Sequence, residues 1–69
     1  MRIKYDSDAD ILIFVLRDVS PVDAIEEPGG VIVSYGEDGD PVSVEFMNAA
    51  SRNLIHEDGV SVTLQTKSA

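Results

Sequence analysis

Apolar and polar residues alternate in several short segments of the chain. The alternation covers residues 2–5, 31–35, 42–46 and 60–64. Successive side chains of a β-strand point to opposite faces, so each segment is typical of a strand with one buried face. The apolar positions hold mostly Val, Ile, Tyr and Phe, which favour strands. The pattern predicts a mainly β fold, a small antiparallel meander sheet of four to five strands.

The segment DILIFVL (residues 10–16) differs from the others because it is apolar on both faces. An antiparallel strand normally leaves one face in contact with water. We therefore expect a second layer or a partner to cover this strand. One face of the predicted strand carries Leu12, Phe14 and Leu16, and the other carries Ile11, Ile13 and Val15.

Turn-forming residues stand between the predicted strands. In GEDGDP (36–41), the pair Asp38-Gly39 favours the positive φ of a tight hairpin, and Pro41 suits the first position of a strand. EEPGG (26–30) breaks the chain a second time. Residues 22–27, just before this break, are predicted to form a short, charged edge strand.

Residues 48–59 fit two different structures. Asn48 can cap a short helix that runs to a C-terminal cap at Gly59. Alternatively, Asp58-Gly59 can close a hairpin that leads into the predicted strand at residues 60–64. Of the two, we expect a short helical turn near residues 48–54, added to the mainly β fold.

Three aspartates, Asp6, Asp8 and Asp10, occupy alternate positions before the apolar strand, as in the first half of a calcium-binding EF-hand loop. Such a loop requires a glycine at its sixth position and a glutamate at its twelfth. Here these positions hold Ile11 and Arg17. Aspartate side chains also cap backbone N–H groups in turns, so the segment predicts a hairpin turn and no metal site.

Composition narrows the range of functions. We expect a single small domain over residues 1–66 and a frayed C-terminus at 67–69. The chain has no cysteine for disulfides or a zinc–thiolate site, which favours the cytoplasm, and no apolar run approaches the roughly 20 residues that cross a bilayer. A formal charge of −8 disfavours direct binding to nucleic acid or membranes and favours a basic protein partner.

His56 is the only histidine, and Glu57 follows it. A histidine beside a carboxylate can act as a general base, but catalysis also requires a nucleophile or bound water and a pocket. A chain of this length has little volume for such a pocket. We therefore expect no catalytic residue and no cofactor. The alternative is a small enzyme or ligand-binding subunit whose site joins His56, Glu57 and Asp6 across a dimer.

The order of IKYDSDADILIF, EEPGGVIVSYGEDGDPVSVEF and NAASR resembles that in domain-of-unknown-function family 2283, a family of small bacterial proteins, over about residues 3–53. The resemblance implies an antiparallel β domain and no established activity. It also implies that this chain is the acidic, antitoxin-like partner of a small basic protein, because some family members are paired with such proteins in toxin–antitoxin-like arrangements.

The chain departs from the family pattern in two places. Asn48 replaces the family's aspartate, and Ala50 stands at its serine position unless Ser51 takes that place. Any role for a carboxylate or hydroxyl there is therefore in doubt. On the outer face of the second strand, Ile13 and Val15 stand where the family tends to have a tyrosine and an arginine.

These observations predict a non-enzymatic protein–protein interaction module that forms a homodimer or a higher oligomer. A helical turn covers only about a quarter of a face of four or five strands, which measures roughly 400 Å² in projection. The rest of the apolar face would stay exposed in a monomer. The expected members of this face are Ile3, Leu12, Phe14, Val33, Val44 and Phe46.

Overall fold

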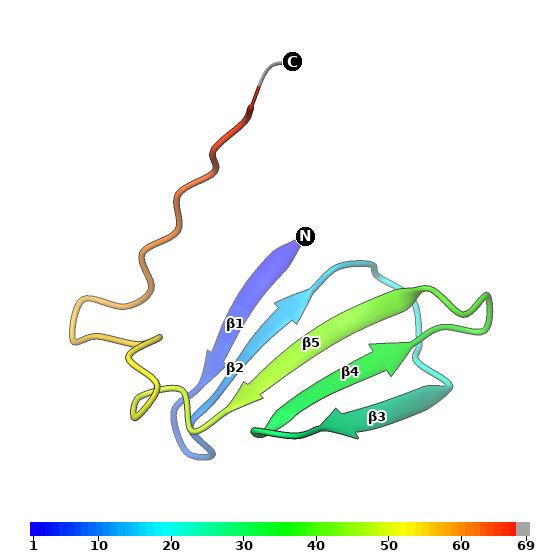
Figure 1. Cartoon of the computed structure of the whole chain (residues 1–69), viewed down its shortest axis with the longest axis horizontal. Helices are drawn as coiled ribbons and strands as arrows, with labels where there is room; N and C mark the ends of the chain where they lie inside the picture. The colour runs from blue at the N-terminus through cyan, green and yellow to red at the C-terminus, as the bar shows by residue number, and fades with distance from the viewer. Residues whose placement is uncertain (68–69) are drawn as a thin grey trace.

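Five β-strands form one open antiparallel sheet in the computed structural model, which describes residues 1–67 (Figure 1). The predicted mainly β fold is confirmed, and no helix occurs among the described residues. Residues 68 and 69, which belong to the predicted frayed terminus at 67–69, lie outside them. The strands are β1 (Arg2–Asp6), β2 (Ile11–Val15), β3 (Asp23–Glu27), β4 (Val31–Tyr35) and β5 (Pro41–Met47).

The strand order across the sheet is β1-β2-β5-β4-β3. A β1–β2 hairpin and a β3–β4–β5 meander are joined where β2 pairs with β5. The meander prediction therefore holds for the second unit, and the order of the whole sheet differs because the chain passes from β2 in the interior to β3 at an edge. The predicted charged edge strand at residues 22–27 is confirmed as β3.

The aspartate-rich segment between β1 and β2 forms a turn at residues 7–10, as predicted. The Oδ1 atom of Asp6 accepts hydrogen bonds from the backbone N–H groups of Asp8 (3.1 Å) and Ala9 (3.2 Å). A carboxylate that caps N–H groups in this way stabilises a turn without any metal ion. Asp10, the last residue of the turn, has a positive φ of 56°.

The β4–β5 hairpin depends on Gly39, which has a φ of +84°. The N–H of Gly39 donates to the carbonyl of Gly36 (2.9 Å), and the N–H of Gly36 donates to the carbonyl of Asp40 (2.9 Å). This pattern is a type I turn followed by a glycine in the left-handed region, the usual three-residue hairpin loop. The positive φ predicted for the Asp38-Gly39 pair is confirmed at the glycine.

A single helical turn follows β5, near the predicted position of 48–54. Its C-terminal residue, Asn53, has a φ of 61°, and its N–H donates to the carbonyl of Ala50 (3.1 Å). The N–H of Leu54 donates to the carbonyl of Ala49 (3.0 Å). Together these bonds form a Schellman motif, which ends a helix. The alternative of a helix that continues to Gly59 is wrong, because the chain reverses at Asn53.

Residues 60–64 form no strand, so the prediction of a strand there is wrong. The preceding residues do close a tight turn, in which His56 and Gly59 exchange backbone hydrogen bonds of 3.0 and 2.9 Å. The chain then continues without a neighbouring strand. Alternating apolar residues favour a strand, but a strand in a sheet also needs a neighbouring strand. Residues 60–64 have no such neighbour among residues 1–67.

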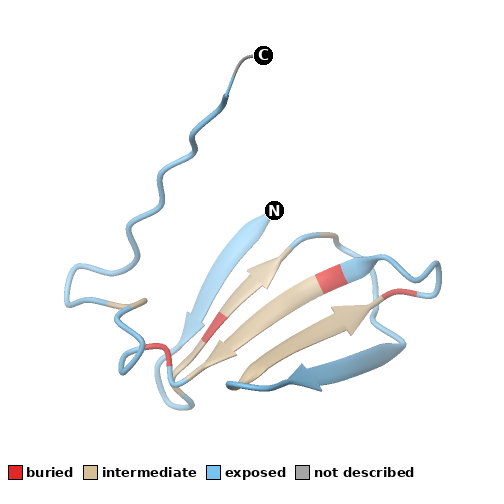
Figure 2. Ribbon diagram, in the orientation of Figure 1, coloured by how far each residue is buried: buried red, intermediate tan, exposed pale blue. Residues whose placement is uncertain are grey.

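Few hydrophobic side chains are fully buried: among residues 1–67 they are Leu12, Val42 and Ala49. Figure 2 shows the buried positions as short, separate stretches of a chain that is otherwise half-buried or exposed. The edge strands β1 and β3 are exposed along their whole length. Within the described residues the sheet is a single layer, because no helix or second sheet packs on it.

We expect Gly39→Ala to lower the free energy of unfolding by about 1 kcal/mol or more, because an L-residue is strained at this positive φ. A Cβ at this position would meet no atom within 4 Å, so the effect is purely conformational. Thermal or urea denaturation measures it. Glu37→Ala in the same loop and D-alanine at position 39 are the controls, and both should stay close to the wild type. Equal stability of the Gly39→Ala and wild-type chains would contradict the loop geometry.

Candidate interaction surface

The strand register gathers apolar side chains from all five strands in two adjacent rows on one face of the sheet. Paired residues of neighbouring strands point to the same face, so the rows follow from the pairing. We call these two rows the apolar face. One row contains Ile3, Phe14, Val44, Val33 and Ile25, and the other contains Tyr5, Leu12, Phe46 and Val31 and ends at Glu27.

All six residues predicted for this face lie in the two rows. The centre of the face is aromatic: the rings of Phe14 and Phe46 meet edge to face, with centroids 5.5 Å apart. Such aromatic contacts stabilise cross-strand packing. They also leave a continuous apolar surface, because no charged side chain interrupts either row before β3.

Most of the apolar face is accessible to solvent. Leu12 is buried, whereas Ile3 is 39% exposed, Tyr5 37% and Ile25 45%. The remaining apolar members are half-buried, and Glu27 is exposed. These exposures are high for side chains of this kind in a folded domain.

The opposite face of the sheet is mixed rather than apolar. Ile13 lies there between Lys4 and Glu45, and Ile32 lies between Glu45 and Glu26. In this row, charged and apolar side chains alternate across the strands, and the charged groups remain hydrated beside the isoleucines. Between the two faces, the apolar face is the stronger candidate for binding another protein.

The segment after β5 covers only the part of the apolar face around Leu12 and Phe14. Leu12 and Phe14 line a groove of about 330 Å³ with Leu54 and residues 60–63. Leu12, at the base of this groove, is the buried member of the face. His56 also lines the groove, so the one histidine lies beside an apolar surface.

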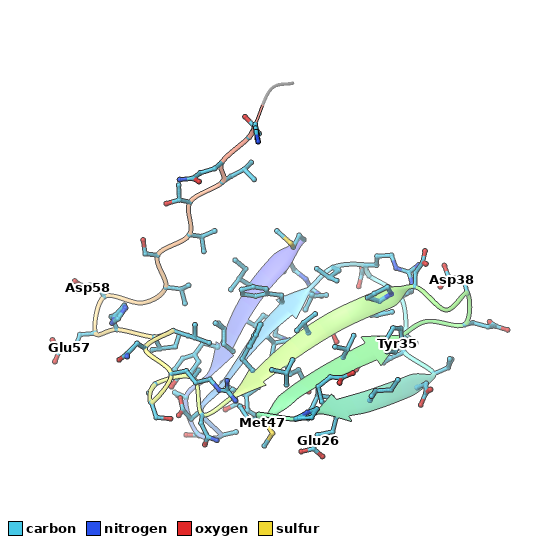
Figure 3. All side chains as sticks on the ribbon, viewed as in Figure 1. Glu26, Tyr35, Asp38, Met47, Glu57 and Asp58 are labelled. Carbon is cyan, nitrogen blue, oxygen red and sulfur yellow. The ribbon has the colours of Figure 1, made fainter. Side chains whose placement is uncertain are left out.

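Within one chain, the structure does not bring together His56, Glu57 and Asp6, the residues of the alternative site across a dimer. Figure 3 shows Glu57 and Asp58 at the outside of the loop, with their side chains directed away from the sheet. In residues 1–67, no ion pair includes His56 and no hydrogen bond joins it to Asp6 or Glu57 through its side chain. Over the same residues, there is no cluster of three metal-ligating side chains and no helix of the length and apolar character needed to cross a membrane.

Asp10 links the β1–β2 turn to the helical turn after β5, a contact that sequence reasoning missed. Its Oδ1 atom accepts the Tyr5 hydroxyl (2.7 Å) and the N–H of Ala50 (3.0 Å), and its carbonyl accepts the N–H of Ala49 (3.1 Å). The hydrogen bond to Asp10 raises the pKa of Tyr5 above its ordinary value. This contact fixes the segment after β5 against the end of the sheet.

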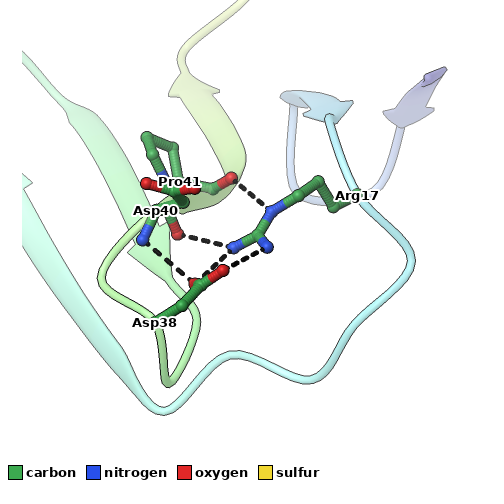
Figure 4. A network of polar contacts seen from close by, with 4 residues as sticks. All are labelled: Arg17, Asp38, Asp40 and Pro41. Atoms are coloured by element: carbon green, nitrogen blue, oxygen red, sulfur yellow. Dashed lines mark hydrogen bonds and ion pairs between the residues drawn. The ribbon is translucent and has the colours of Figure 1, made fainter.

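Arg17 joins the β2–β3 connection to the β4–β5 hairpin (Figure 4). Its guanidinium donates to both carboxylate oxygens of Asp38, at 2.8 and 2.9 Å, and to the carbonyls of Asp40 (2.9 Å) and Pro41 (3.2 Å). Bidentate arginine–carboxylate pairs are among the stronger polar contacts in proteins. The hydrogen bond from Arg17 holds the pKa of Asp38 below its ordinary value.

Comparison with known proteins gives one match. The sequence model of a family described as "Protein of unknown function (DUF2283)" matches residues 2–49, which is more than half of the chain and includes the whole sheet. The match confirms the family resemblance indicated by the sequence. No curated protein and no solved structure matches the chain.

The ion pair of Asp38 predicts a pH dependence of stability. The pKa of the Asp38 carboxyl is lower in the folded state than its ordinary value of 3.8. The ion pair therefore adds to the free energy of unfolding at pH values above 3.8, and this stabilisation is lost as the pH falls through the lower, folded-state pKa. We expect Asp38→Asn to melt at a lower temperature than the wild type at pH 7, and the difference to narrow below pH 3.8. Glu37→Gln, in the same loop, should follow the wild type at every pH. Equal melting temperatures of Asp38→Asn and the wild type at pH 7 would rule out a stabilising pair.

Proposed function

Since this chain belongs to the DUF2283 family of proteins of unknown function, we propose its function from its own surface. The chain is a non-enzymatic protein–protein interaction module that self-associates through the apolar face. The cysteine-free composition supports a reducing compartment, and we propose the cytoplasm.

The observation that carries this proposal is the amount of surface left exposed. The accessible surface of the chain is 5323 Å² for a mass of 7.5 kDa. A folded monomer of that mass exposes about 4,250 Å², so the excess is about 1,100 Å². The open apolar face and the extended residues 60–67 both contribute to it.

A dimer removes an excess of this size. A specific protein–protein interface buries about 800 Å² on each partner. Two copies that pack sheet against sheet bring identical apolar faces together about 10 Å apart, with their strands roughly aligned. A two-fold axis makes this contact self-complementary and closed, so association through the apolar face ends with the dimer and does not continue to larger assemblies.

The charge distribution permits this contact although each chain carries a formal charge of −8. Within the two rows of the apolar face, Glu27 at the β3 end is the charged member. Most other carboxylates lie in loops or on the opposite face. Their repulsion across the dimer is therefore weakened by distance and by salt.

We expect the chain to sediment at twice its 7.5 kDa mass at micromolar concentration. Phe14→Asp, at the centre of the face, should abolish both the dimer and the fold, because it buries a charge in either state. Ile25→Asp, on the exposed edge strand, should leave the monomer folded and raise the dissociation constant about tenfold or more. Ala24→Asp places the same charge beside it on the opposite face, and it should dimerise as the wild type does.

A folded monomer of the wild-type chain at tens of micromolar would overturn the proposed self-association. Equal dimer affinities for Ile25→Asp and Ala24→Asp would move the interface to another surface.

A small basic protein is the second partner that we propose, in an antitoxin-like role. The support is the formal charge of −8 and the position of β3 at the edge of the sheet, where Asp23, Glu26 and Glu27 are exposed. A basic segment that adds to this edge gains main-chain hydrogen bonds and charge complementarity.

Affinity capture from the native cells tests this second partner. The wild-type chain should retain one basic protein, identified by mass spectrometry, and a chain with Asp23→Asn, Glu26→Gln and Glu27→Gln should not. Loss of the same protein on Glu37→Gln, outside the β3 edge, would show that capture reflects net charge only.

A further inference from the structure

Residues 60–64 have the composition of a strand, but in the described part of the chain no strand pairs with them. Valine and leucine alternate with serine and threonine in VSVTL. The exposed fraction rises along the segment from 37% at Val60 to 61% at Val62 and 89% at Leu64. Apolar side chains exposed at regular alternate positions mark a surface that another element covers.

The segment starts above the apolar face of its own sheet and not in the plane of the sheet. Residues 60–63 line the groove with Leu12 and Phe14, which lie on that face. Figure 1 shows the segment leaving the sheet on the side of β1, without joining it. In a sheet-on-sheet dimer, the layer above this face is the layer of the second copy's sheet, about 10 Å away.

The outer edge of β1 is the matching acceptor. β1 spans five residues, Arg2–Asp6, and pairs on one side only. On the apolar face it presents Ile3 and Tyr5, which are 39% and 37% exposed. The other free edge, β3, presents Asp23 and Glu27 on that face, on either side of Ile25. The valine and leucine side chains of residues 60–64 would therefore lie beside apolar side chains at the edge of β1, but beside carboxylates at the edge of β3.

We propose that residues 60–64 of one copy add to the outer edge of β1 in a second copy, as a sixth strand, and that the second copy returns the same contact. This inference rests on the proposed self-association. Val60, Val62 and Leu64 then extend the partner's apolar face, and Ser61 and Thr63 face solvent. A stable interface usually buries about 800 Å² of surface on each partner, and a face of roughly 400 Å² in projection provides only part of this area. The exchanged strands would bury additional surface.

Disulfide cross-linking between two variants of the full chain tests the exchange, because the natural sequence has no cysteine. A Val62→Cys or Leu64→Cys chain is mixed with an Ile3→Cys chain and oxidised. The two cysteine positions cover the registers in which Val62 or Leu64 lies opposite Ile3, with the apolar side chains on the same face. Cross-strand neighbours reach disulfide geometry, with Cβ atoms about 4 Å apart. We expect a mixed dimer linked between positions 62 or 64 and position 3, and little product with an Ile25→Cys chain.

The outcomes separate this inference from the proposed function. If the chain sediments as a dimer but no cross-link to position 3 forms, the strand exchange is overturned and the proposed self-association is retained. Efficient cross-linking to the Ile25→Cys chain in place of the Ile3→Cys chain would have the same consequence. A disulfide within one chain, in a chain carrying both Val62→Cys and Ile3→Cys, would show that the segment pairs with its own edge, and would also overturn the exchange. A monomeric wild-type chain would overturn both.

A pair of substitutions in the segment gives a second readout. Val62→Asp places a carboxylate on the apolar side of the added strand and should raise the dimer dissociation constant about tenfold or more. Thr63→Asp adds the same charge on the solvent side and should leave the constant within about twofold of the wild type. Equal constants for the two variants would exclude a strand with this orientation.

Discussion

The main constraint on this structure is that residues 1–67 form a sheet without a second layer, so most of the apolar face of the sheet has nothing packed on it. Stable domains bury the apolar side of a sheet against a second layer. Here the residues after β5 form one helical turn and an extended segment, and they cover only the part of the apolar face around Leu12 and Phe14. An isolated layer buries little area, and the hydrophobic stabilisation of folding scales with buried area. A second copy supplies the missing layer in our account, and its binding stabilises the fold by mass action.

Polar contacts at the two ends of the sheet define its shape without covering its faces. At one end, Asp10 connects β1 through Tyr5 to the helical turn through Ala50. At the other end, Arg17 connects the β2–β3 passage to the hairpin loop through Asp38. Both contacts join segments that are distant in sequence, and neither of them covers the apolar face.

Much of the sheet was predictable from sequence because its signals are local. The alternation within each strand, the positive φ of Gly39 and the capping by Asp6 all act within a few residues. The apolar face was predictable for the same reason, since alternation fixes which side chains share a face. The strand order and the Arg17–Asp38 pair were not, because both depend on the pairing of β2 with β5. Residues 60–64 have the pattern of a strand, and only the tertiary arrangement shows that no strand of residues 1–67 pairs with them.

Isotope-filtered NMR on a mixture of labelled and unlabelled chains tests the central claim most directly, because it detects only contacts between copies. The account predicts intermolecular NOEs between the rings of Phe14 and Phe46 in one copy and the methyl groups of Val33 and Val44 in the other. Intermolecular NOEs confined to the opposite face, at Ile13, or their absence at millimolar concentration, would contradict it.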